Sequence, residues 1–235
     1  MLELTGMRVA QNGFSLAGDL RLDAGRRVAV IGPSGAGKST LLDVIAGFRA
    51  PQAGALRWQG TDIGALPPQA RPVSMLFQDQ NLFPHLTLER NLGLALRPDG
   101  GRLSAAQAGL VADALRRMGL DDLGGRRPGA LSGGQQARGA LARVLLQARP
   151  IILLDEPFAA LGPALRTEML EEVEAVAGAA EALVLLVSHD PSDARRFAQE
   201  VVYVDEGRVH APVDTQSLFA NPPEALRAYL GSGAG

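Results

Sequence analysis

Residues 27–40 read RVAVIGPSGAGKST, and this stretch decides the fold. Its first five residues, Arg27–Ile31, form an apolar run of strand length. The pattern GxxxxGKS follows over residues 32–39, and a helical pattern runs from Thr40 to Gly47. A strand, a glycine-rich turn and a helix in this order predict a loop that wraps phosphate groups.

The residue types of this loop indicate its chemistry. Glycines allow backbone N–H groups to turn inward around phosphate oxygens, and the helix N-terminus adds roughly half a unit of positive charge. We expect Lys38 to reach the β- and γ-phosphates of a nucleotide and Ser39 to hold Mg²⁺. The predicted nucleotide-binding residues of this loop are Gly32, Pro33, Ser34, Gly35, Ala36, Gly37, Lys38, Ser39 and Thr40.

Lys38 is the only lysine in the chain, because 22 of the 23 basic residues are arginine. The planar guanidinium of arginine is wider than an ammonium group and is suited to bidentate pairing. A chain that uses lysine once, and uses it in this loop, supports the prediction of phosphate binding independently of the motif.

Composition sets limits on the class of protein. With 235 residues, 46% of them hydrophobic and 20% charged, the chain can bury a sizeable core. The net charge of −2 argues against binding nucleic acid through bulk positive charge, and the absence of cysteine excludes disulfides. No run of 18 apolar residues predicts a transmembrane helix, so we expect a chain that docks on a membrane protein rather than one that spans the bilayer.

Short apolar runs alternate with helical patterns along the chain. Runs without alternation predict a parallel sheet covered on both faces. A hairpin signal at residues 11–13 predicts a small antiparallel piece at the N-terminus, and residues 86–118 indicate an inserted helical part.

The predicted fold is an α/β P-loop NTPase core with a mostly parallel sheet, an N-terminal antiparallel β subdomain and an inserted helical subdomain. We expect one domain over residues 1–235, with the helical subdomain at about 85–145 and a flexible tail at 231–235. The predicted parallel strands are Arg27–Ile31, Val73–Phe77, Ile151–Leu154, Leu183–Val187 and Val201–Val204.

Two carboxylates end the strand at Ile151–Leu154. Ligands of parallel α/β sheets bind at the carboxyl ends of the strands. Asp155 at that end suits Mg²⁺, and Glu156 is placed to orient or deprotonate an attacking water. Two ordinary surface acids are the alternative, which the phosphate loop upstream disfavours.

Between these elements, residues 131–135 read LSGGQ, and a helical run follows through Arg149. Here the whole chain resembles the nucleotide-binding domains of ATP-binding cassette (ABC) transporters. In the order of that family, Gln78 matches the Q-loop, Ala159–Gly162 the D-loop, and His189 the switch histidine.

The resemblance implies a mechanical ATPase. Two copies would form a head-to-tail dimer, with each ATP between the phosphate loop of one chain and the signature of the other. Gln78 would bind Mg²⁺ and link to a transmembrane permease, and His189 would contact the γ-phosphate. The predicted catalytic residues are Lys38, Gln78, Glu156 and His189; the metal ligands Ser39, Gln78 and Asp155; and the signature residues on ATP Ser132, Gly133, Gly134 and Gln135.

Three positions depart from the family pattern. The D-loop usually ends in Asp, but Gly162 stands here, which puts coupling between the two sites in doubt. Ala137 replaces a common glutamine. No aromatic residue precedes Lys38 at the spacing that usually stacks on adenine; the nearest is Phe14, which can equally be a core residue of the first sheet.

Within the family, the chain is similar to the ATPase subunit of bacterial thiamine importers at residues 71–78, 81–83, 85–87, 41–48 and 163–170. The same role for iron(III), sulfate, molybdate or polyamines is the alternative. The expected partners are a second copy, a permease and, indirectly, a periplasmic solute-binding protein, at the cytoplasmic face of the inner membrane. A cassette ATPase acting on DNA or ribosomes is the rival class; the balanced charge, a single GxxxxGKS and the lack of a sustained heptad run disfavour it, so we expect no nucleic-acid partner.

Overall fold

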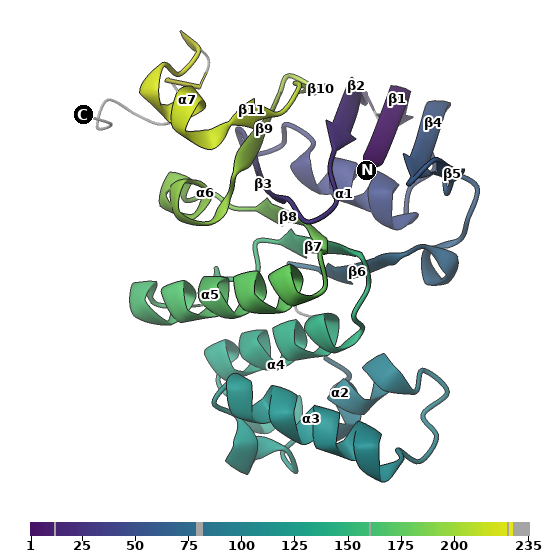
Figure 1. Cartoon of the computed structure of the whole chain (residues 1–235), viewed down its shortest axis with the longest axis vertical. Coiled ribbons are helices and arrows are strands. Elements are labelled where there is room, and N and C mark those ends of the chain that lie inside the picture. Colours follow the sequence, from purple (N-terminus) through teal and green to yellow (C-terminus); the bar gives the residue numbers. More distant parts are fainter. Residues whose placement is uncertain (12, 79–81, 160, 225, 228–235) are drawn as a thin grey trace.

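The computed structural model describes residues 1–11, 13–78, 82–159, 161–224 and 226–227. Across these residues one curled sheet runs in the order β5-β4-β1-β2-β10-β9-β3-β8-β7-β6, and β11 pairs with β9 (Figure 1). The strands are β1 Leu2–Gln11, β2 Phe14–Leu22, β3 Arg27–Ile31, β4 Ala53–Trp58, β5 Thr61–Asp62, β6 Val73–Leu76, β7 Ile151–Asp155, β8 Leu183–Val187, β9 Glu200–Asp205, β10 Arg208–Val209 and β11 Val213–Asp214.

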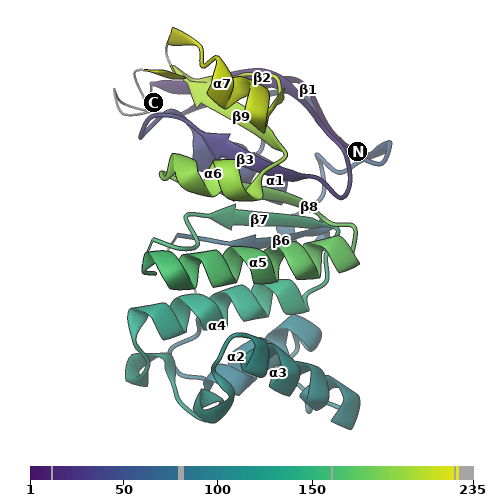
Figure 2. The same cartoon turned by 60° about the vertical axis from the view of Figure 1, so that its left-hand side comes forward.

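Seven helices cover this sheet in the described part of the chain. Figure 2 shows them in layers: α1 lies under the antiparallel strands, and α5, α4 and then α2 with α3 lie beyond β6 and β7. The helices are α1 Lys38–Ala46, α2 Leu88–Leu96, α3 Ala105–Arg117, α4 Gly133–Leu146, α5 Pro163–Ala179, α6 Pro191–Phe197 and α7 Thr215–Ala220.

The parallel strands β9, β3, β8, β7 and β6 form the centre of the molecule. All five residues of β8 are fully buried, as expected for a parallel strand covered on both faces. This confirms the predicted fold class, with the predicted strands correct to within one residue at each end.

Alternate residues of β7 belong to two different cores. Ile151 and Leu153 pack with α1 and the antiparallel strands, whereas Ile152 and Leu154 pack with α4 and α5. Successive side chains of a strand point to opposite faces of the sheet. The helix that follows the phosphate loop and the helix that follows the signature therefore lie on opposite faces of β7.

The antiparallel part confirms the predicted hairpin and extends it. β1 pairs with β2 across the turn, of which residue 12 lies outside the described residues. β4 pairs with the other edge of β1, from Leu2↔Trp58 to Arg8↔Ala53. β4 was not predicted, although Leu56 and Trp58 on its buried face alternate with the exposed Arg57.

The helix after the signature is shorter than predicted. It ends at Leu146, three residues before Arg149, with Gln147 as its C-cap. Ala148 has a φ of 48°, which terminates the helical conformation, and Pro150 disfavours helix in the residue before it. The predicted tail at 231–235 lies outside the described residues.

Candidate functional site

The carboxyl ends of four parallel strands meet at one edge of the sheet. Val30 of β3 pairs with Val187 of β8, and Val187 pairs with Asp155 of β7. On the far side of β7, Leu154 pairs with Leu76, the last residue of β6. The residues that follow these strands, among them Gly32, His189, Glu156 and Gln78, therefore leave the sheet at the same edge. Chain segments more than 120 residues apart in sequence are brought together by this register.

The phosphate loop folds around its own lysine. Lys38 is 6% exposed, and its Nζ donates hydrogen bonds of 2.8 Å to the carbonyl oxygens of Gly32 and Pro33. Burial lowers the pKa of the ammonium group, and the nearby carboxylates of Glu156 and Asp155 partly oppose this shift. The predicted lysine is thus enclosed by the loop and faces both predicted carboxylates.

Glycine conformations shape the turn into α1. Gly37, the N-cap, has a φ of 111°, a conformation that other residues rarely adopt, and no side chain caps the helix. A Cβ atom at Gly37 would lie 2.8 Å from Cζ of Phe14. The ring of Phe14 therefore lies against the loop, while it also packs on the core. Both interpretations of Phe14, the adenine contact and the core residue, are compatible with this position.

Asp155 is a buried carboxylate that lacks a full set of partners. It is 5% exposed, and its Oδ1 atom has no hydrogen-bond partner among the described residues. Burial raises the pKa of this carboxyl, while a hydrogen bond with the side chain of Ser39 lowers it. The two predicted metal ligands on different elements are therefore in contact. An orphaned buried carboxylate oxygen beside a hydroxyl fits a hard divalent cation.

Glu156 and His189 contact each other directly, through Oε1 and Nε2. Glu156 has a φ of 49°, and its backbone N–H donates to the carbonyl of Val187 at 3.1 Å. A positive φ at a non-glycine residue costs energy and is often found at functional sites. The Glu156 side chain is 14% exposed and that of His189 is 50% exposed, so the pair lies where the buried strand ends open to solvent.

Gln78 follows β6 in a turn and is exposed. The strand register brings it to the edge of the sheet that carries Asp155, but residues 79–81 beyond it lie outside the described part of the chain.

The signature residues begin α4 on the opposite face of β7 from α1. Ser132 is the N-cap: its Oγ accepts from the N–H of Gln135 at 3.2 Å, and Gln135 Oε1 accepts from the N–H of Ser132 at 2.8 Å. This reciprocal pair is a capping box, which the spacing Ser-x-x-Gln also signals in the sequence. Both residues were predicted to bind nucleotide, and their capping role was not predicted.

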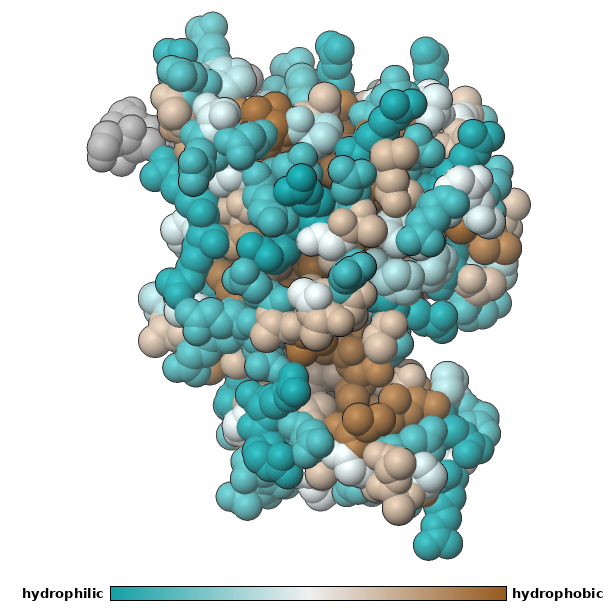
Figure 3. Space-filling model, viewed as in Figure 1, coloured by the Kyte–Doolittle hydropathy of each residue, from teal (hydrophilic) through white to brown (hydrophobic). Residues whose placement is uncertain are grey.

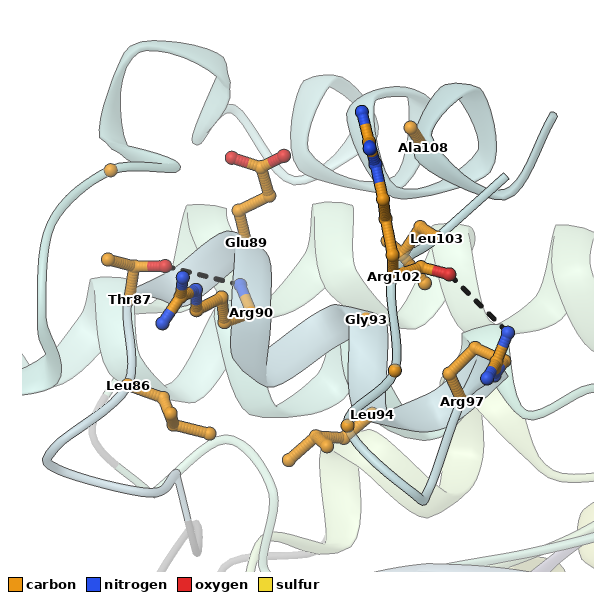
Figure 4. A pocket seen from close by; sticks show the side chains of 13 residues that line it. Leu86, Thr87, Glu89, Arg90, Gly93, Leu94, Arg97, Arg102, Leu103 and Ala108 are labelled. Carbon is orange, nitrogen blue, oxygen red and sulfur yellow. Dashed lines mark hydrogen bonds between the residues drawn. The ribbon is translucent and has the colours of Figure 1, made fainter. Parts of the chain in front are cut away.

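Two cavities lie near the predicted site residues, one along α2 and one beside Glu156 and His189. One of about 800 Å³ lies along α2 and is lined by Leu86, Arg90, Leu94, Arg97 and Arg102, among others; Figure 4 shows these side chains around the helix. The other, of about 380 Å³, adjoins Glu156 and His189. The second cavity is also lined by Arg166, Asp190 and Asp193, which the sequence analysis did not assign. No helix in the described residues is long and apolar enough to cross a bilayer.

The curled sheet, the phosphate loop before α1 and the carboxylates at the end of β7 define a P-loop ATPase of the cassette type. A family model described as "ABC transporter" matches residues 17–159, and the chain belongs to this family. It is an ATPase of the kind that couples ATP hydrolysis to transport.

Relatives of known name match almost the whole chain. The "Thiamine import ATP-binding protein ThiQ" of Cereibacter sphaeroides is 59% identical over 98% of this chain and all of the relative. The protein of the same name from Escherichia coli K12 is 49% identical over 98% of this chain and 99% of the relative. Among solved structures, the dimeric post-hydrolysis state of the ATP-binding cassette MJ0796, bound to ADP and Pi, matches with a TM-score of 0.81 and 27% identity. That match covers 92% of this chain and 99% of the solved one.

Proposed function

We propose that this chain is the ATP-hydrolysing subunit of a bacterial thiamine importer. The observation that carries the proposal is the cluster formed by Lys38, Asp155, Glu156 and His189 at the carboxyl edge of the sheet. The cargo rests on a different observation, the similarity to thiamine-import ATP-binding proteins over the full length. We further propose that residues 1–235 work as one ATP-binding unit, with residues 85–145 as its helical, signature-bearing part.

ATP is held by the phosphate loop. Lys38 exchanges the carbonyl oxygens of Gly32 and Pro33 for the β- and γ-phosphate oxygens, which are better partners because they are charged. The first N–H groups of α1 have no side-chain cap, so they remain available to phosphate. The remaining loop residues, Ser34, Gly35, Ala36 and Thr40, contribute backbone and hydroxyl donors.

Ser39, Asp155 and Gln78 would hold Mg²⁺. The pair formed by Ser39 and the orphaned Asp155 carboxylate supports this set, and Gln78 would supply a neutral amide oxygen. Bound there, the ion would neutralise phosphate charge and orient the phosphate oxygens.

Glu156 would accept the proton of the attacking water. A general base in contact range of its substrate typically contributes ~10²–10⁴-fold to the rate. His189, which contacts Glu156 here, would turn to the γ-phosphate once ATP is bound. Half of its side chain surface is open to solvent, so this movement meets little packing resistance.

A second copy would complete the site. The signature residues Ser132, Gly133, Gly134 and Gln135 begin α4, on the other face of β7 from α1, so they are available to a nucleotide on another chain. The Oγ of Ser132 accepts from its own helix and keeps its O–H to donate to a phosphate. The solved relative, which is dimeric, supports a dimer of this kind.

The permease would dock along α2. Arg90, Arg97 and Arg102 surround the cavity there, although Arg97 is paired with Asp99 at 2.8 Å. Figure 3 shows apolar surface gathered in the lower half of the molecule. Phe83, whose N–H donates to the Asn91 side chain of α2 at 2.7 Å, is 45% exposed. A groove with apolar and cationic walls suits a cytoplasmic helix of a membrane partner, and docking there would hold the chain peripherally at the inner face of the membrane.

Reconstitution of the importer tests which solute is transported. The chain is combined with its permease, and the ATPase rate is measured with the cognate binding protein loaded in turn with thiamine, iron(III) and molybdate. We expect stimulation by the thiamine-loaded protein alone. Stimulation by another loaded form alone would contradict the thiamine proposal while leaving the ATPase intact.

A further inference from the structure

An ionic cluster lies beside the catalytic cavity and has no assigned role. The 380 Å³ cavity is lined by Glu156 and His189 and also by Arg166 with two carboxylates, Asp190 and Asp193. Arg166 is on the first turns of α5, whereas Asp190 and Asp193 begin α6. The cluster therefore joins the helix after the D-loop to the segment that carries His189.

The contacts of this ionic cluster include both sequence neighbours of His189, Ser188 and Asp190. Nη1 of Arg166 lies 2.8 Å from Oδ2 of Asp190 and 3.7 Å from Oδ2 of Asp193. Ser188 Oγ donates to Asp193 Oδ2 at 2.6 Å and accepts from the N–H of Asp190 at 3.1 Å. The residue before His189 and the residue after it are thus both fixed by one network.

Burial makes the charge of Arg166 important to this network. Asp193 is 4% exposed and Ser188 is 7% exposed, so neither is stabilised mainly by water. Burial raises the pKa of Asp193, and the charge of Arg166 is among the interactions that oppose the rise. Removing the guanidinium would leave the neighbouring carboxylates of Asp190 and Asp193 without the positive charge that lies between 2.8 and 3.7 Å from them.

The other end of the network reaches the D-loop. The backbone N–H of Arg166 donates to the carbonyl of Gly162 at 2.9 Å. Gly162 is the N-cap of α5 and provides no side-chain cap. The family usually has Asp at position 162. In this chain, contacts run from Gly162 to Arg166 and from Arg166 to Asp190, the residue that follows His189.

We propose that Arg166 is a positioning residue that holds the His189 segment in register with the D-loop. It acts through Asp190 and Ser188 and does not itself touch the nucleotide. The inference rests on the proposed function of His189, and it predicts an effect on turnover without an effect on ATP binding.

The test compares Arg166→Gln with Arg166→Lys in the full chain. We expect Arg166→Gln to lower kcat about tenfold to a hundredfold, the scale of a misplaced catalytic group, with KM and nucleotide affinity unchanged. Arg166→Lys should recover most of the rate, because a single nitrogen, Nη1, makes the contacts to both carboxylates. The matched control is Arg196→Gln, which removes a 2.7 Å pair with Glu171 between the same two helices but does not contact the 188–190 segment. It should leave kcat unchanged.

A double-mutant cycle separates positioning from general stability. In a His189→Ala background, Arg166→Gln should cause no further loss of turnover, and both Arg166 variants should still be folded at the assay temperature by circular dichroism, even if Arg166→Gln melts below Arg196→Gln because Asp193 is buried. Wild-type kcat in Arg166→Gln, or losses that add to those of His189→Ala, would overturn the inference alone. Wild-type turnover in His189→Ala itself would overturn the proposed role of His189 and the inference with it.

Discussion

Two helix N-termini carry the two candidate halves of the ATP site, and they are built differently. α1 begins after Gly37 with no side-chain cap, beside a lysine that is 6% exposed. α4 begins after the exposed Ser132, and its first turn is already closed by a capping box with Gln135. The first half offers free backbone donors and a buried charge within one chain. The second offers a hydroxyl and two glycine N–H groups, a weaker set that suits closure by a second copy rather than initial binding.

The largest expected effect is on turnover, and it comes from Glu156, which belongs to the first half of the ATP site. Glu156→Gln should lower turnover by about 10²–10⁴-fold, because the amide cannot accept the proton of water, while ATP binding persists. An ATP-dependent dimer should then accumulate and be visible by size-exclusion chromatography. Glu181→Gln is the matched control, since Glu181 also has a φ of 49° but is exposed on the turn before β8, at the amino end of that strand and not at the carboxyl end that carries the site. Turnover at the wild-type rate in Glu156→Gln would contradict the assignment of the base.

The second largest expected effect is on nucleotide affinity, and it comes from Lys38 in the same half of the site. Lys38→Ala should weaken ATP binding to the isolated chain by about 10- to 100-fold, the equivalent of one charge-assisted hydrogen bond. Lys38→Arg should not restore it, because the wider guanidinium has to fit a site where the native side chain is 6% exposed. Fluorescent-nucleotide titration measures both variants. Unchanged affinity in Lys38→Ala would mean that the loop does not bind phosphate.

Ser132 tests the second half of the comparison. Ser132→Ala should leave ATP affinity of the isolated chain unchanged, reduce ATP-dependent dimerisation and turnover, and cost about 1 kcal/mol through loss of the cap. That cost corresponds to about 2–4 °C in melting temperature. Ser132→Asp keeps a capping acceptor but adds a negative charge, so it should keep the melting temperature and lose the dimer. If ATP affinity of the isolated chain fell in either variant, the two halves would not be separate.

The smallest expected effect is on the melting temperature, and it comes from Gly162 at the N-terminus of α5. Gly162 caps α5 with a φ of −70°, and apart from its chain neighbours no atom of the described residues lies within 4 Å of where its Cβ would be. Gly162→Asp should therefore fit and add a side-chain cap worth a few tenths of a kcal/mol, about 1 °C in melting temperature. Differential scanning calorimetry measures this, with Gly178→Asp as a control in the last turn of the same helix, where the added negative charge opposes the helix dipole and should give no gain. A drop in melting temperature for Gly162→Asp would show that the open space is not usable.

Local chemistry made much of the site predictable. The conformations around Gly37 are dictated by neighbouring residues, so GxxxxGKS predicts the loop wherever a strand and a helix flank it. Asp155 and Glu156 are predictable because a buried strand must end in polar residues at the ligand-binding edge. The candidate roles of these residues remain predictions, as do those of Gln78 and Phe14.

Other features depended on which segments the fold brings together. Arg166 carries no motif of its own, and its pairing with Asp190 joins residues 24 positions apart on two helices. β4 was missed because its pairing with β1 crosses about 50 residues of chain. The early end of α4 depends on one backbone conformation at Ala148 that residue preferences do not predict.

The sequence by itself determined the phosphate loop, the five parallel strands and the family, because these depend on short-range conformational preference and on residue patterns. Only the tertiary structure decided that the signature lies on the opposite face of β7 from the phosphate loop, and that Glu156, His189 and the Arg166 cluster share one cavity. The physical reason is strand register. Pairing of Val30, Val187 and Asp155 across three parallel strands sets which loops meet, and those residues carry no local signal of their partners.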